Sequence, residues 1–111
     1  MPTDPVVRTP LLTAGLAGSM TVERVEVMRI RMSPGLASGL HLHPCPVVGV
    51  ITEGSVLFQV EGQEERVLRP GDAFYEPANV NVPHFDALEQ GATFIAHYLL
   101  APGEHELIRM L

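Results

Sequence analysis

The 111-residue chain has little cysteine, no lysine and no long hydrophobic run. Because Cys45 is the sole cysteine, no disulfide forms within the chain, and a reducing compartment is the simplest setting. The apolar residues 11–18 are too few and too rich in glycine to span a membrane. The seven basic residues are scattered arginines against 13 acidic residues, so a patch that would bind nucleic acid is not expected. The sequence therefore predicts a cytoplasmic protein that binds neither nucleic acid nor membrane.

Proline and glycine are plentiful, with ten of each spread along the whole chain. Between them lie short segments in which apolar and polar residues alternate, which is typical of half-buried strands. About eight such segments occur, at residues 22–32, 37–43, 47–51, 56–60, 66–68, 73–76, 82–88 and 93–100. Glu53-Gly54 is expected to be a turn. We predict an all-β, single-domain protein in which residues 1–20 form a tail or edge strand and residues 21–111 form a β-barrel.

The last predicted strand, residues 93–100, is apolar on both of its faces. One face should pack against the core, and the other face also needs cover from water. A second copy of the chain would supply that cover, so we expect a homodimer.

Three histidines in two turn-rich stretches are the candidate functional residues. His41 and His43 are two positions apart, so on an extended strand their imidazoles point to the same face. His84 follows the second turn-rich stretch, residues 71–77. Neutral imidazole is the commonest metal ligand, and three imidazoles with open coordination positions suit catalysis. The alternative is that all three are ordinary surface or core histidines.

These stretches resemble the two sequence motifs of the cupin family. The first is matched by Gly35-x5-His41-x-His43-x3-Val47-x6-Gly54, and the second by Gly71-x5-Pro77 followed by Val82-Pro83-His84. The resemblance implies a cupin-type jelly-roll β-barrel. It implies less about function, because this fold hosts many reactions and some members catalyse none.

The chain departs from the family pattern in two places. Val47 stands where the first motif has a glutamate, and His84 lies slightly farther from Pro77 than the second motif expects. The resemblance therefore implies a three-histidine site of His41, His43 and His84 that holds one divalent ion of iron, zinc, nickel, manganese or copper. Three neutral imidazoles would leave the full charge of that ion in an apolar pocket, which favours a small anionic ligand.

Val47 and three other residues are further candidates for the pocket or the site. Glu76 is either a replacement ligand or base, or a solvent-facing carboxylate at the end of a strand. His97 either orients a bound ligand or is a core or interface histidine. Cys45 is either a reactive thiolate beside the metal or a small buried hydrophobe.

Two functional hypotheses follow, and both expect a small molecule as the partner. The first is a metal-dependent dioxygenase or isomerase that acts on a small chelating anion. The second is a non-catalytic module that binds a metal or a small ligand. The second is favoured by the lack of a strong base, nucleophile or carboxylate pair beside the histidines.

Overall fold

The computed structural model describes residues 5–111, which form seven strands and no helix. The strands are β1 (Arg24–Met32), β2 (His41–Leu42), β3 (Val47–Gln59), β4 (Arg66–Leu68), β5 (Ala73–Glu76), β6 (His84–Leu100) and β7 (Arg109–Met110). The predicted all-β class is confirmed. This part of the chain contains no helix long and apolar enough to cross a membrane.

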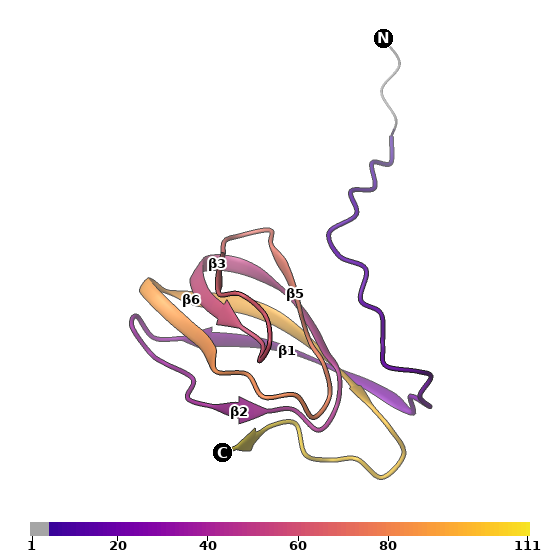
Figure 1. Ribbon diagram of the computed structural model, residues 1–111. Coiled ribbons are helices and arrows are strands. Elements are labelled where there is room, and N and C mark those ends of the chain that lie inside the picture. The colour runs from indigo at the N-terminus through magenta and orange to yellow at the C-terminus, as the bar shows by residue number, and fades with distance from the viewer. Residues whose placement is uncertain (1–4) are drawn as a thin grey trace.

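The predicted tail contains no strand over residues 5–20, and Figure 1 shows it running away from the strands. Its first four residues lie outside the described part of the chain.

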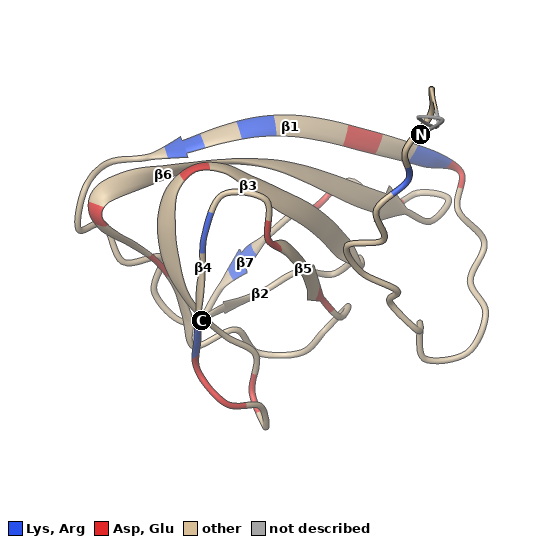
Figure 2. Ribbon diagram, turned by 90° about the horizontal axis from the view of Figure 1, so that it is seen from above, with Lys and Arg blue, Asp and Glu red and all other residues tan. Residues whose placement is uncertain are grey.

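Two long antiparallel strands, β3 and β6, form the centre of the main sheet (Figure 1). The sheet order is β1-β6-β3-β4, and β5 pairs with the first half of β3. The short strands β2 and β7 form a second, two-stranded sheet. Figure 2, seen from above, shows β2 and β7 between β4 and β5. Residues of both sheets, among them His41 of β2 and Tyr98 of β6, line one cavity.

The expected turn at Glu53-Gly54 is wrong, because both residues lie inside β3. The strand bends there instead, with register shifts between Ile51 and Glu53 and between Gly54 and Val56. Gly54 has a φ of 71°, and a Cβ at this position would collide with the carbonyl of Gly91 on β6. Glycine and a β-bulge thus let one continuous strand turn a corner that the sequence pattern suggests is a break.

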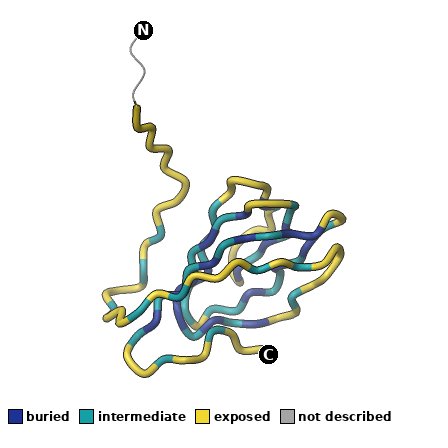
Figure 3. Tube along the Cα trace, turned by 180° about the vertical axis from the view of Figure 1, so that it is seen from behind, coloured by how far each residue is buried: buried dark blue, intermediate teal, exposed yellow. Residues whose placement is uncertain are grey.

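All four phenylalanines of the chain pack together in the core. Phe58, Phe74, Phe85 and Phe94 have neighbouring ring centroids 4.7–5.9 Å apart, most of them in edge-to-face arrangements. Along β6 buried and half-buried residues alternate from Phe94 to Leu100, and this alternation is visible in Figure 3. Phe94, Ala96 and Tyr98 therefore share the inward face.

Candidate metal centre

His41 and His43 extend from β2 and the position just after it into the interior, where they are 3% and 5% exposed. His41 is held on both sides, by pairing with Met110 on β7 and by a bridge to Val82. Its Nδ1 lies 2.7 Å from the carbonyl oxygen of Gly39, and the Nδ1 of His43 lies 2.7 Å from that of Leu107. A carbonyl oxygen only accepts hydrogen bonds, so each Nδ1 carries a hydrogen and donates it. In the neutral form of each ring, Nε2 is therefore left with its lone pair.

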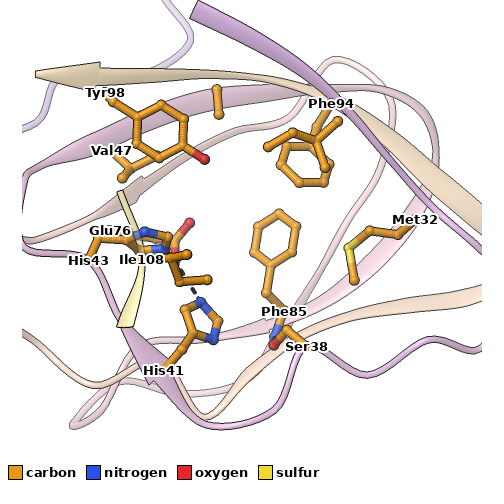
Figure 4. A pocket seen from close by; sticks show the side chains of 12 residues that line it. Met32, Ser38, His41, His43, Val47, Glu76, Phe85, Phe94, Tyr98 and Ile108 are labelled. Atoms are coloured by element: carbon orange, nitrogen blue, oxygen red, sulfur yellow. Dashed lines mark hydrogen bonds and ion pairs between the residues drawn. The ribbon is translucent and has the colours of Figure 1, made fainter. Parts of the chain in front are cut away.

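Glu76 brings a carboxylate to the two histidines from the last position of β5. Its Oε2 lies 3.0 Å from Nε2 of His43 and 3.7 Å from Nε2 of His41. Ligand atoms of the three residues all lie within 4.8 Å of one another, and Glu76 is only 3% exposed. Figure 4 shows the three side chains converging at one end of a pocket.

This arrangement puts three hydrogen-bond acceptors face to face. Two imidazole lone pairs and a carboxylate repel one another in a buried place unless a cation lies between them. The cation is either a proton on an imidazole or a metal ion. Two imidazoles and one carboxylate form a donor set that proteins use for divalent zinc and for non-haem iron, so the residues fit the divalent ion implied by the fold.

The charges of the cluster stabilise one another without a metal. Burial alone would raise the pKa of the Glu76 carboxyl, but His41 and His43 hold that pKa below its usual value. Burial alone would lower the pKa of His43, but its hydrogen bond to Glu76 and the charge of that carboxylate raise the pKa. Both shifts favour a negative Glu76 beside a positive His43 when only protons are available.

The structure does not bring His84 to this cluster. Its Nδ1 lies 2.8 Å from Oδ2 of Asp86, its Nε2 lies 3.7 Å from Oε1 of Glu65, and its side chain is 38% exposed. Val82, not His84, is the residue that faces His41 across the bridge. His84 lies two residues beyond Val82, at the first position of β6, where its ring meets Asp86 and Glu65 and not the cluster. The expected convergence of three histidines is thus replaced by two histidines and Glu76.

Val47 and Glu76 are neighbours in the sheet. They are direct partners across β3 and β5, so their side chains lie on the same face of the sheet. Val47 is fully buried and lines the pocket. Glu76 therefore brings a carboxylate, from the neighbouring strand, to the face on which position 47 of this chain has a valine in place of the motif's glutamate.

His97 and Cys45 lie apart from the cluster. His97 is on the outward face of β6, opposite to Ala96 and Tyr98, and donates from Nδ1 to the carbonyl of Val48. Cys45 is buried, and burial raises the pKa of its thiol to about 11. Without a metal the thiol is therefore protonated near neutral pH, as expected of a small buried hydrophobe.

A cavity of about 250 Å³ opens beside the cluster. Figure 4 shows His41, His43, Glu76 and Tyr98 at one side and the apolar Met32, Phe85 and Phe94 at the other. Tyr98 is a pocket residue that sequence reasoning missed, although strand alternation places it on the same face as Phe94. Burial, followed by the nearby charge of Glu76, raises the pKa of its hydroxyl to about 12.

The sequence profile of the Cupin domain family matches residues 28–85. This is more than half of the chain, so the chain belongs to the cupin family, and the predicted all-β cupin fold is confirmed. A comparison with curated proteins finds no significant match.

Solved structures of similar fold include enzymes of different kinds. The DMSP lyase DddQ from Ruegeria pomeroyi has 20% identity and a TM-score of 0.69 over 78% of this chain and 42% of its own. Oxalate decarboxylase from Bacillus subtilis has 22% identity and a TM-score of 0.67 over 81% of this chain and 24% of its own. An RmlC-like cupin from Shewanella frigidimarina has 25% identity and a TM-score of 0.61 over 71% of this chain and 68% of its own. The chain thus spans less than half the length of the two enzymes, and its likeness to them is a likeness of fold.

Proposed function

We propose that this chain binds one divalent transition-metal ion through Nε2 of His41, Nε2 of His43 and the carboxylate of Glu76. The observation that carries the proposal is that Nε2 of His41 and Nε2 of His43 lie 3.7 and 3.0 Å from the buried Glu76 carboxylate while both Nδ1–H groups are bound to backbone carbonyls. Such hydrogen bonds to the far side of an imidazole are the usual means by which proteins fix a metal-binding ring. Iron, zinc, nickel, manganese and copper are all compatible with these donors.

The bound ion would supply Lewis acidity toward a small ligand in the cavity. The residues of the chain have separate tasks in this proposal. Met32, Phe85 and Phe94 exclude water from the ligand, which strengthens the polar contacts made at the other end. Tyr98 keeps its proton near neutral pH because its pKa is raised to about 12, so its hydroxyl can donate a hydrogen bond to the ligand.

Metal analysis of protein purified without an affinity tag tests the site. We expect near-stoichiometric uptake of a divalent ion by the parent and loss of nearly all of it in His43→Ala. The matched control is His84→Ala, which removes an imidazole from outside the cluster and should keep the parent's metal content. Circular dichroism of each variant establishes that it is folded. A parent that takes up no metal, or equal loss in both variants, would refute the site.

A metal-dependent dioxygenase or isomerase acting on a small chelating anion is the finer form of this proposal. It is tested by oxygen uptake of the iron-loaded protein with diketones, catechols and thiols, and by product analysis for isomers. Tight metal binding without turnover of any compound would favour the second candidate, a non-catalytic binding module. Glu76, the carboxylate beside His41 and His43, serves as a ligand in this proposal and is not free to act as a general base, which favours that module.

The homodimer and the cytoplasmic location remain predictions. On the outer face of the main sheet, Val25 and Val27 of β1 are 50% and 60% exposed. They lie directly opposite Leu99 and His97 of β6, so apolar groups gather on a face that a second copy could cover. Light scattering should then give twice the chain mass of 12.1 kDa.

A further inference from the structure

We infer that the ligand of the cavity is a small monoanion with an apolar body, and that dianions of the same size are rejected. The inference rests on the proposed metal site and adds the class of ligand which that site accepts. The net charge of the metal site limits the charge of the ligand. A divalent ion with two neutral imidazoles and the Glu76 carboxylate has one net positive charge left. One further negative charge on a ligand neutralises the site, and a second leaves a buried negative charge without a partner.

The cavity offers no cation to a second negative group. None of the 12 residues that line the cavity (Figure 4) is a lysine or an arginine. Away from the metal-binding residues, Ser38 and Tyr98 bring the only side-chain hydroxyls. The Ser38 hydroxyl is already engaged, because it accepts from the Phe85 N–H and donates to the Gly39 carbonyl.

The nearest arginines along the chain are directed elsewhere. Arg29 and Arg31 alternate along β1 with Ile30 and Met32, and they are exposed while these two apolar residues are half-buried. Arg109 follows Ile108, but both ends of its guanidinium are bound to the Glu106 carboxylate at 3.0 and 2.8 Å. The blue segments of β1 and β7 in Figure 2 carry these arginines. Within the described part of the chain no lysine or arginine thus reaches the cavity, and a ligand there meets positive charge at the metal.

The far end of the cavity selects for an apolar body. Met32, Phe85 and Phe94 form that end, across the cavity from His43 and Glu76 (Figure 4). A volume of about 250 Å³ holds roughly eight water-sized groups, enough for a head group and a short carbon chain. Each methylene that leaves water for this wall should improve affinity about threefold to fourfold. Oxalate, a dianion without an apolar body, satisfies neither requirement.

Binding of simple carboxylates to the cobalt-loaded protein tests the inference without any assay of activity. The visible absorption of cobalt(II) reports ligand binding at the metal, and acetate, butyrate and hexanoate form a series of growing apolar length. We expect affinity to rise about tenfold for every two methylenes until the cavity is full. Succinate has a carboxylate where butyrate has its methyl group, and should bind at least about tenfold more weakly. Equal affinity of succinate and butyrate, or no gain along the series, would overturn the inference.

A charge placed at the far end should reverse the preference. Met32→Arg provides a cation at the apolar wall, and we expect it to improve succinate affinity relative to butyrate at least about tenfold over the parent. Met32→Leu changes the shape without the charge and should keep the parent's preference. The cobalt content of the protein distinguishes failure of the metal site from failure of the inference about its ligand. A parent that takes up no cobalt refutes the metal site and this inference together, whereas full cobalt uptake without a preference for monoanions refutes the inference alone.

Discussion

Two clusters among residues 5–111 combine histidine with carboxylates, and one of the two has the properties of a metal site. In the first, His41, His43 and Glu76 are each at most 5% exposed, and each Nδ1 is bound to a backbone carbonyl. In the second, His84 lies between Asp86 and Glu65, with 38% of its own side chain and 53% of that of Glu65 exposed. Both clusters thus combine imidazole with carboxylate, the first as two histidines and a glutamate and the second as one histidine with an aspartate and a glutamate.

The difference lies in what the hydrogen bonds leave free. In the first cluster they occupy the far nitrogen of each ring, so both near nitrogens face the same carboxylate oxygen. In the second, Asp86 itself receives the Nδ1–H of His84, and water can solvate the charges. Burial and ring orientation, more than the presence of histidine and acid, distinguish a metal site from a surface ion pair.

Exchanging the carboxylate for an amide should give the largest difference in zinc affinity between the two clusters. Glu76→Gln removes a charged ligand and should lower affinity for zinc about 100-fold or more, because even outer partners of a metal site are worth 10–100-fold. Asp86→Asn is the matched change in the second cluster and should leave zinc affinity unchanged. Calorimetric titration of both variants measures the difference. Similar affinities for the two variants would mean that Glu76 is not a ligand.

The metal-free protein should show a pH dependence that belongs to the first cluster. The pKa of Glu76 is lowered from 4.5, so its contribution to stability is present above pH 4.5 and is lost as the pH falls through its folded value. The pKa of His43 is raised from 6.5, so its contribution is present below pH 6.5 and is lost as the pH rises through its folded value. The stabilising charge pair is therefore fully present between these two values. The Tm of the metal-free parent minus that of Glu76→Gln should be largest in this window, and a difference that does not change with pH would contradict the assignment.

The smallest effect is expected from breaking the second cluster. His84→Ala removes a partly exposed ion pair, whose side chains are 38% and 19% exposed, and pairs near the surface are worth at most about 1 kcal/mol. Asp86 keeps its other role, which is to accept the N–H of Ser38 at 3.1 Å. Denaturant unfolding should thus show a loss of free energy of unfolding of at most about 1 kcal/mol. A much larger loss would show that His84 supports the fold in a way that its surface position does not explain.

Most of the fold could be predicted from alternation and turn residues. The segments predicted as separate strands at 47–51 and 56–60 are one strand, because Gly54 allows a bend where the pattern suggests a turn. Local sequence does not distinguish these cases, since the bend depends on the close approach of Gly91 from β6.

Part of the site could also be predicted from the sequence. The spacing of His41 and His43 suffices to place both rings on one face. From the sequence Glu76 could equally be a ligand or base or a solvent-facing carboxylate. Its place beside the histidines comes from its pairing with Val47 on the neighbouring strand, which the sequence does not reveal. The position of His84 depends on the path of the chain after Pro77, which brings Val82 and not His84 opposite His41, and that pairing cannot be read from the spacing of the residues.

Anomalous diffraction at the zinc edge, from crystals grown with zinc, would locate the bound ion and its ligands together. We expect one strong peak about 2.0–2.2 Å from Nε2 of His41, Nε2 of His43 and a carboxylate oxygen of Glu76. A peak beside His84 and Asp86, or no peak in the interior, would contradict the proposed site.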